Sequence, residues 1–185
     1  MASNYLKAQF LRAAAVRPPE GYGRNLGVDQ RAYLAGFIDG EGNINISGGI
    51  NKNGNQNWAL VVTLYNCNLN ALETMRDWLG VGSILARKRT SRWRTNYALK
   101  WRGISALKVL EAAYPFLIIK KKQAEIAFQF AQTICPGNFT GSSWQSNKRL
   151  KPEIVSRRRE LKLELQKLTG TANYGGDNSL KAAIN

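Results

Sequence analysis

Two acidic side chains near residue 40 are the first candidates for chemistry. Asp39 and Glu41 lie two positions apart, and the preceding residues predict a helix over 30–39. Both carboxylates then fall at the C-terminal end of this helix, where the helix dipole disfavours negative charge unless a cation is present. Proteins hold Mg²⁺ with one or two carboxylates plus phosphate oxygens of the substrate. The pattern therefore predicts either a magnesium site or a helix end with polar caps.

The same helix carries small residues on neighbouring turns, namely Ala32, Ala35, Gly36 and Gly40. Small side chains let two backbones approach each other closely. This face of the helix could therefore pack against another helix of the chain or against a copy of itself.

The chain as a whole is strongly basic. Its 185 residues include 27 Lys and Arg against 12 Asp and Glu, a net charge of +15. Acidic residues are absent from 42–72 and again from 78–110, and the second window is rich in Arg and Lys. This balance requires a polyanionic partner. Nucleic acid is favoured over an anionic membrane, because the basic residues follow strand-like patterns and not those of an amphipathic helix.

Composition excludes several classes of function. The chain has no histidine, which excludes Ser-His-Asp triads and nucleases that hold a metal through histidine. Cys67 and Cys135 are too few for a thiolate zinc site and do not suggest a disulfide framework. No apolar run approaches the ~20 residues that span a bilayer, so we expect no membrane-spanning helix.

Periodicity and turn residues predict the elements that would position these groups. Alternation of polar and apolar residues predicts strands over 43–47, 58–65, 83–89 and 92–101. Helical spacing predicts helices over 30–39, 69–79, 104–113, 121–134 and 152–168. This order predicts an α+β fold whose antiparallel sheet has one apolar face and one polar, basic face. We interpret 29–169 as one domain, 1–28 as an N-terminal arm or a mitochondrial presequence, and 170–185 as a flexible tail.

The polar face of this sheet is predicted to bind nucleic acid. In the DNA major groove, which admits a two-stranded ribbon, Arg can read guanine and Asn can read adenine. The alternative is a plain solvent-facing surface, which the absence of Asp and Glu from this face disfavours. The candidate contact residues are Asn43, Asn45, Ser47, Asn57, Thr63, Arg87, Arg89, Arg92, Arg94, Asn96 and Lys100.

Two segments carry a resemblance to a known family. The residues Leu34-Ala35-Gly36-Phe37-Ile38-Asp39-Gly40-Glu41-Gly42 resemble the motif of LAGLIDADG homing endonucleases, and Lys120-Lys121-Lys122-Gln123-Ala124 resembles the basic active-site segment of that family. The resemblance implies an α+β fold in which an antiparallel, saddle-shaped sheet has helices on one face. It also implies an intron- or intein-encoded endonuclease whose sheet lies in the major groove of a long, pseudo-palindromic DNA site. Such enzymes cut both strands across the minor groove and leave 3′ overhangs.

The same resemblance implies a homodimer, because the chain contains one copy of the motif and the motif helices of two copies would meet on the twofold axis. The residues expected at this interface are Ala32, Ala35, Gly36, Asp39 and Gly40.

The resemblance also assigns roles to single residues. Glu41 matches the metal-binding acid, with the backbone carbonyl of Gly40 beside it, and the metal would be Mg²⁺ or another divalent cation such as Mn²⁺. Lys122 matches the lysine that polarises water or stabilises charge near the scissile phosphate; a phosphate contact in a basic patch is its alternative. Asn68 matches a polar residue of the solvent pocket, and Asp39 is interpreted as mainly structural. Bound cations can activate water and stabilise the leaving oxygen without histidine.

Two other functions stay open on the sequence alone. One is a non-cleaving protein that binds intron RNA and assists splicing, as some relatives of this family do. The other is a basic structural RNA-binding protein with an accidental motif, whose binding would collapse as salt rises. The sequence leaves the compartment undetermined between a prokaryotic cytoplasm and an organelle.

Overall fold

The computed structural model describes residues 26–50, 56–87, 95–134 and 150–170, and these form an α+β fold. One antiparallel sheet has the strand order β1-β2-β4-β3. Its strands are β1 (Gly42–Ile50), β2 (Gln56–Asn66), β3 (Ser83–Arg87) and β4 (Asn96–Arg102). The helices are α2 (Val28–Glu41), α3 (Leu69–Leu79), α4 (Ile104–Ala113), α5 (Lys121–Gln132) and α6 (Pro152–Leu168), with the short 3₁₀ helix η1 (Tyr114–Phe116).

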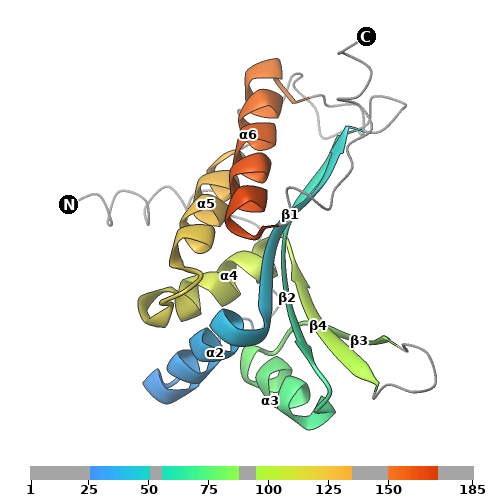
Figure 1. Ribbon diagram of the computed structural model, residues 1–185, viewed down its shortest axis with the longest axis vertical. Coiled ribbons are helices and arrows are strands. Elements are labelled where there is room, and N and C mark those ends of the chain that lie inside the picture. The colour runs from blue at the N-terminus through green and yellow to red at the C-terminus, as the bar shows by residue number, and fades with distance from the viewer. Residues whose placement is uncertain (1–25, 51–55, 88–94, 135–149, 171–185) are drawn as a thin grey trace.

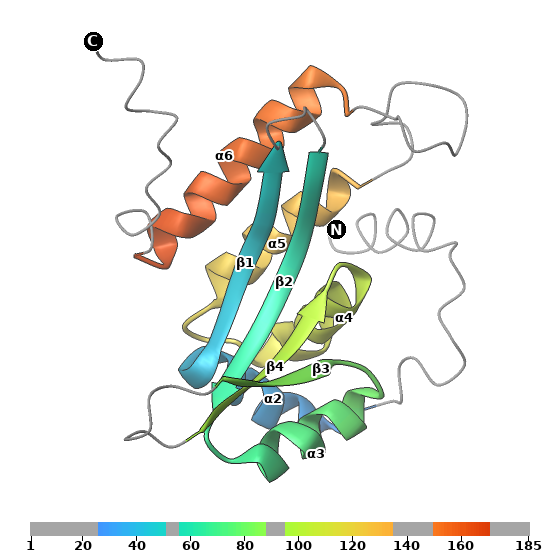
Figure 2. The same cartoon turned by 90° about the vertical axis from the view of Figure 1, so that its right-hand side faces the viewer.

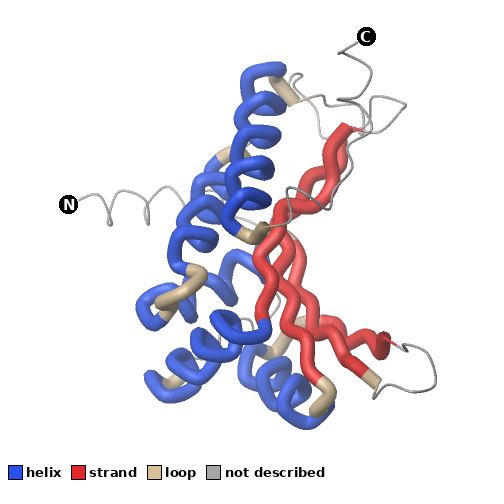
Figure 3. The backbone as a smooth tube through the Cα atoms, viewed as in Figure 1, coloured by secondary structure: helices blue, strands red, loops and turns tan. Residues whose placement is uncertain are grey.

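The helices cover one face of a curved sheet (Figures 1 and 3). Figure 2 shows the molecule from the right-hand side of Figure 1, and in this view β1 and β2 lie in front of α5. The predicted fold class is confirmed: the sheet is antiparallel, and among the described residues no helix covers its second face. None of the helices in the described ranges is both long and apolar enough to cross a membrane.

The alternation of residue types along the strands explains the two faces of the sheet. Successive strand side chains point to opposite faces, so every second residue meets the helices. These inward residues are almost fully buried, and they are Ile44, Ile46, Leu60, Val62, Leu64, Leu99 and Trp101. The helices complete the core with Leu34, Ile38, Leu72, Met75, Val109, Leu110, Phe130, Leu161 and Leu165. The residues between the inward ones therefore form the open face.

The junction between α2 and β1 determines where the motif segment lies. Gly42 has an extended conformation, and its N–H caps the helix by donating to the carbonyl of Ile38. A Cβ at this position would lie 2.5 Å from the Ile38 carbonyl oxygen, closer than any side chain tolerates. Glycine at position 42 thus lets the chain pass from α2 directly into strand β1 without a loop. The last helical residue, Glu41, consequently lies at the edge of the sheet.

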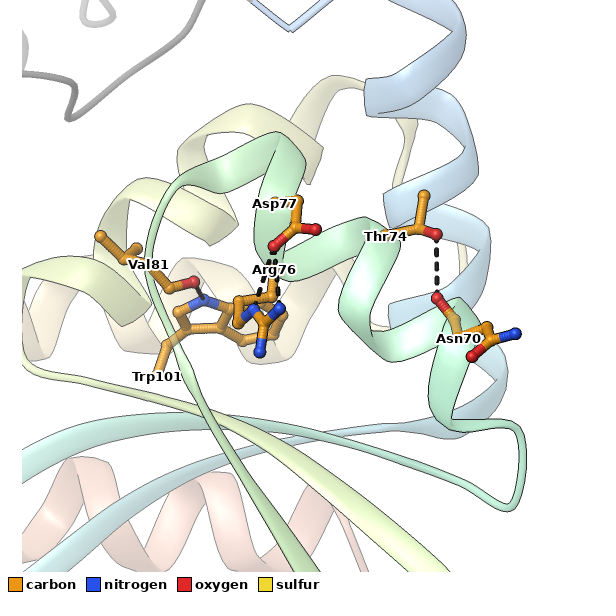
Figure 4. Close-up of polar contacts among 6 residues, drawn as sticks. All are labelled: Asn70, Thr74, Arg76, Asp77, Val81 and Trp101. Carbon is orange, nitrogen blue, oxygen red and sulfur yellow. Dashed lines mark hydrogen bonds and ion pairs between the residues drawn. The ribbon is translucent and has the colours of Figure 1, made fainter.

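Helix α3 and its following turn are tied to the sheet (Figure 4). The helix ends at Gly80, whose φ of 69° is left-handed and whose N–H donates to the Arg76 carbonyl. The indole N–H of Trp101 in β4 donates to the carbonyl of Val81 at 2.8 Å. Since Trp101 is itself in the core, this bond anchors the connection from α3 to β3.

Most predicted element bounds are confirmed within a few residues, and those over 69–79, 104–113 and 152–168 match α3, α4 and α6. The strands predicted over 43–47 and 58–65 are longer in the structure, because β1 continues to Ile50 and β2 begins at Gln56. Gly48 has φ +90° and still pairs with Trp58; a Cβ there would lie 1.5 Å from the Asn57 carbonyl oxygen. Glycine indicated a loop in the sequence, whereas here it continues the ladder.

Candidate active site

Glu41 offers an exposed carboxylate at the end of α2. No hydrogen bond or ion pair joins it to any other residue in the described ranges. Two residues along a helix correspond to a rotation of about 200° about its axis, so their side chains point in nearly opposite directions. Asp39 and Glu41 therefore face different surroundings although they are near neighbours in sequence.

Asp39 is bound within its own chain by the segment that leads into α5. Its carboxylate accepts hydrogen bonds from the backbone N–H groups of Ile118 (2.8 Å), Ile119 (3.2 Å) and Lys120 (2.8 Å). The ammonium group of Lys120 donates to the backbone carbonyl of Asp39. The helix end is thereby capped by a cation, which its dipole favours, and the 118–120 segment is fixed beside it.

Lys120 is the lysine that the structure places beside the acidic pair. Burial lowers the pKa of this lysine, while the charges of Asp39 and Glu41 oppose the shift and raise it. Both carboxylates therefore act on its ammonium group. Sequence reasoning missed Lys120, because a run of three lysines does not reveal which one faces the helix end.

Lys122, the lysine predicted to be catalytic, is an exposed residue in the first turn of α5. The contacts with Asp39 belong to Lys120, two positions earlier. A helix turns by about 200° over two residues, so the two lysines do not share an orientation. Geometry favours Lys120 for the catalytic role, and the role of Lys122 stays a prediction.

The structure gives Asn68 a role at the start of a helix. Its side chain accepts a hydrogen bond from the backbone N–H of Ala71 at 3.2 Å and is the N-cap of α3. Its own N–H donates to the side chain of Asn66. Asn68 thus starts a helix, as its position before Leu69 indicates, and its predicted place in a solvent pocket stays a prediction.

The open face of the sheet brings together most residues predicted to bind DNA. Strand register aligns Asn43 with Thr63, Thr63 with Lys100, and Lys100 with Ser83, which gives one polar row across four strands. The predicted residues on this face are Asn43, Asn45, Ser47, Asn57, Thr63, Arg87, Asn96 and Lys100. Arg89, Arg92 and Arg94 lie outside the described residues. The four strands contain no Asp or Glu.

Two residues change the predicted interface. Thr63 is only 6% exposed, so it belongs to the floor of this face and offers little surface to a ligand. Arg102, which was not among the predicted contacts, donates to the side chains of Asn57 (3.0 Å) and Ser47 (3.4 Å). An exposed guanidinium is thus held across three strands at the far end of the sheet from Arg87.

Of the five residues predicted for a dimer interface, Asp39 is half-buried and bound to the 118–120 segment, and the other four divide into two groups. Ala35 has no exposed surface and belongs to the core of its own chain, so it cannot contact a second copy. Ala32, Gly36 and Gly40 are exposed on α2. A Cβ at Gly36 or Gly40 would meet nothing within 4 Å, so no contact inside the chain requires glycine at either position.

The donor set fits a hard divalent cation but is incomplete in one chain. Carboxylate and carbonyl oxygens, such as those of Glu41 and Gly40, are ligands that Mg²⁺ prefers. The described residues contain no group of three metal-ligating side chains, and Asp39 is already occupied by backbone donors. The remaining ligands would then come from water, from a substrate phosphate or from a second chain.

Comparison with known proteins identifies the family. The family model for LAGLIDADG endonucleases matches residues 34–130, more than half of the chain. A comparison with curated proteins finds no match.

Solved structures of homing endonucleases share the fold. The archaeal intron-encoded I-Vdi141I complexed with DNA is 20% identical with a TM-score of 0.59, over 78% of this chain and 93% of that chain. I-CvuI in complex with the I-CreI target is 21% identical with a TM-score of 0.58, over 75% and 81%. I-SmaMI bound to cleaved DNA is 20% identical with a TM-score of 0.56, over 88% of this chain but 49% of that chain. The chain belongs to the LAGLIDADG endonuclease family.

Proposed function

We propose that this protein is a site-specific endonuclease that cuts both strands of DNA in a reaction that depends on a divalent metal. The observation that carries the proposal is the position of Glu41. It is an unpaired carboxylate among the described residues, it lies beside Lys120, and it borders an open sheet face without acidic residues. A nuclease needs a metal ligand, a fixed cation and a surface that tolerates phosphate, and these three lie together.

The open face would bind the DNA. Side chains such as Lys100, Arg102 and Arg87 can neutralise phosphates or read guanine, and Asn43 and Asn45 can read adenine in the major groove. The sheet would lie in the major groove, with cleavage across the minor groove giving 3′ overhangs. The solved relatives described above were complexed with DNA, which supports DNA as the substrate.

The proposed chemistry distributes three tasks among the residues of the site. Glu41 and the carbonyl of Gly40 would hold Mg²⁺ or Mn²⁺ against a substrate phosphate. Such an ion, when bound, lowers the pKa of its water and stabilises the leaving oxygen. Lys120 would supply positive charge where the phosphoryl oxygens gain negative charge in the transition state. Asp39 would hold the backbone of Lys120 in place.

A homodimer is part of the proposal. Among the described residues, the site in one chain offers one free carboxylate, that of Glu41, and the I-SmaMI chain is about twice as long as the part that this chain matches. Two copies would supply two copies of Glu41 and two open faces, which suits a pseudo-palindromic target. We further propose that the reading frame is intron- or intein-encoded, so that its target spans the insertion point.

The test is cleavage of the joined flanking DNA, that is, the sequence on either side of the intervening element without that element. The Glu41→Gln variant should retain DNA binding but cut at least about a thousandfold more slowly in Mg²⁺, because the metal contributes several kcal/mol to the transition state. Glu164→Gln, which removes the same charge from an exposed site on α6, is the matched control. Cleavage by Glu41→Gln at the wild-type rate would refute the assignment. Tight binding to intron RNA without any DNA cleavage would favour an RNA-binding function instead.

A further inference from the structure

We propose that Leu85 determines specificity at one position of the DNA site, by packing against the C5-methyl group of a thymine in the major groove. The proposal rests on the function proposed above, in which the open face binds DNA, and it names a base that this face would select. Its basis is a row of hydrophobic residues within a face that is otherwise mostly polar and basic.

The register of the strands places three residues in this hydrophobic row. Leu85 in β3 pairs with Ala98 in β4, and Ala98 pairs with Tyr65 in β2. The row belongs to the open face, because Ile84 pairs with the inward-facing Leu99 and successive strand residues point to opposite faces. Aliphatic side chains and an aromatic ring thus lie side by side across three strands, on the side that no helix covers among the described residues.

Leu85 is the member of the row that a ligand can reach most easily. Its side chain is 56% exposed, whereas Ala98 is 5% exposed and forms the floor beneath its larger neighbours. Strand β3 is an edge strand of the sheet. Proteins commonly place charged side chains on edge strands, because an exposed hydrophobic edge invites aggregation. A leucine that points outward at this edge is therefore expected to serve a ligand that covers it.

The surroundings of Leu85 favour DNA as that ligand. Lys100 lies in the row on one side of Leu85, and Arg87 lies in the row on the other side. The guanidinium of Arg87 reaches across β4 and lies 5.5 Å from the centre of the Tyr65 ring. The four strands contain no Asp or Glu. Cations on both sides of Leu85 would hold a nucleic-acid backbone close to it.

The chemistry of the major groove then selects the base. Base edges present hydrogen-bond donors and acceptors there, and the C5-methyl of thymine is the apolar group among them. The Leu85 side chain has no donor or acceptor, so it would remove water from a polar base edge without replacing the lost hydrogen bond. Against a methyl group, the same side chain buries apolar area on both molecules. Leu85 should therefore favour thymine over the other three bases.

Uracil substitution measures this contact, because deoxyuridine differs from thymidine only in lacking the C5-methyl group. The probe is the joined flanking DNA, prepared as a set of duplexes in which uracil replaces one thymine at a time. Binding of the full chain is measured without divalent metal, so that no strand is cut. At one or two thymines, the dissociation constant of the wild type should rise about threefold to fivefold, which corresponds to one buried methyl group.

Variants connect this loss of affinity to Leu85. Leu85→Ala should bind the thymine duplex about threefold to tenfold more weakly, and the same uracil substitution should then change its affinity by less than about 1.5-fold. Leu85→Met, which keeps an apolar side chain of similar volume, should retain the preference for thymine. Leu163→Ala is the matched control, because it shortens a similarly exposed leucine (54%) on α6, and it should retain the full effect of uracil.

The outcomes separate this inference from the proposed function. Equal binding of the wild type to every uracil duplex would refute the methyl contact. A uracil effect that persists in Leu85→Ala, or one that Leu163→Ala also removes, would show that Leu85 does not make the contact. The nuclease assignment would stand in all three cases if the wild type cuts this DNA and Glu41→Gln does not. A wild-type chain that neither binds nor cuts any of the duplexes would refute the proposed function and this inference with it.

Discussion

Replacing Asp39 by asparagine should destabilise the fold, whereas the equivalent change at Glu41 should not. The Asp39 carboxylate accepts three backbone N–H groups, from Ile118 and Ile119 on one oxygen and from Lys120 on the other. Asparagine has one oxygen and one NH₂ group, so it can keep one of these arrangements and must turn a donor toward the other. It also removes the charge that strengthens every bond.

The size of the effect follows from these contacts. A hydrogen bond to a charged group contributes about 1.5–3 kcal/mol, and a neutral one about 0.5–1.5 kcal/mol. Two of the three bonds are exposed and one is partly buried, so the lower ends of these ranges apply. Losing one bond and weakening two should lower the free energy of unfolding by about 2 kcal/mol. Glu41, which is exposed and unpaired among the described residues, should change it by less than about 0.5 kcal/mol on substitution by glutamine.

Urea unfolding followed by circular dichroism measures this difference. The midpoint for Asp39→Asn should fall while the slope with urea stays constant, and the midpoint for Glu41→Gln should match the wild type. Amide hydrogen exchange adds a local readout: the N–H groups of Ile118 and Lys120 should exchange faster in Asp39→Asn. Equal midpoints together with unchanged protection of these two amides would show that Asp39 does not hold the segment, and the reasoning would fail.

Two further predictions concern buried cations. Arg158 is 5% exposed and donates to the side chain and the carbonyl of Thr133 at 2.8 Å, and burial lowers its pKa to about 10. Arg158→Ala should destabilise the fold by about 2–4 kcal/mol in urea unfolding, because α6 loses two hydrogen bonds to the residue that ends α5. A loss below about 0.5 kcal/mol would contradict this. The pKa of Lys120 is lowered from its ordinary value of 10.5 by burial against the opposing charges of Asp39 and Glu41. A ¹³Cε titration should thus give a midpoint below 10.5 for Lys120, and a lower midpoint still in Glu41→Gln. The contribution of Lys120 to stability should rise with pH between its folded and unfolded pKa values, because the unfolded chain binds more protons there. An unchanged midpoint in Glu41→Gln would show that the Glu41 charge does not act on Lys120.

Much of the fold could be predicted because its signals are local. Strand β1 alternates apolar and polar residues at its start, and helices such as α3 have a capping residue at one end and glycine at the other. The predictions failed where pairing between strands overrides local preference. Gly48 and Gly49 look like loop residues in the sequence, yet they extend β1 because β2 supplies their partners.

The site could be predicted only in part, because its contacts are distant in sequence. Glu41 follows from the motif, but Lys120 meets Asp39 across 81 positions, and no local pattern selects it from its neighbour Lys122. For Asn68 a local signal for a helix cap was available, and the structure shows this cap. Ala35 was assigned to an interface because it is small, whereas the packing of its helix turns it inward.

The helix-to-strand junction explains how one short segment can serve stability and chemistry at once. Asp39 and Glu41 are separated by about 200° around α2, so the first carboxylate orders the 118–120 segment and the second remains free. Gly42 then ends the helix without a loop, which keeps the free carboxylate at the edge of the sheet face that is suited to DNA. Because Asp39 holds the 118–120 segment that carries Lys120, a change at this residue should disturb stability and catalysis together, whereas a change at Glu41 should affect catalysis alone.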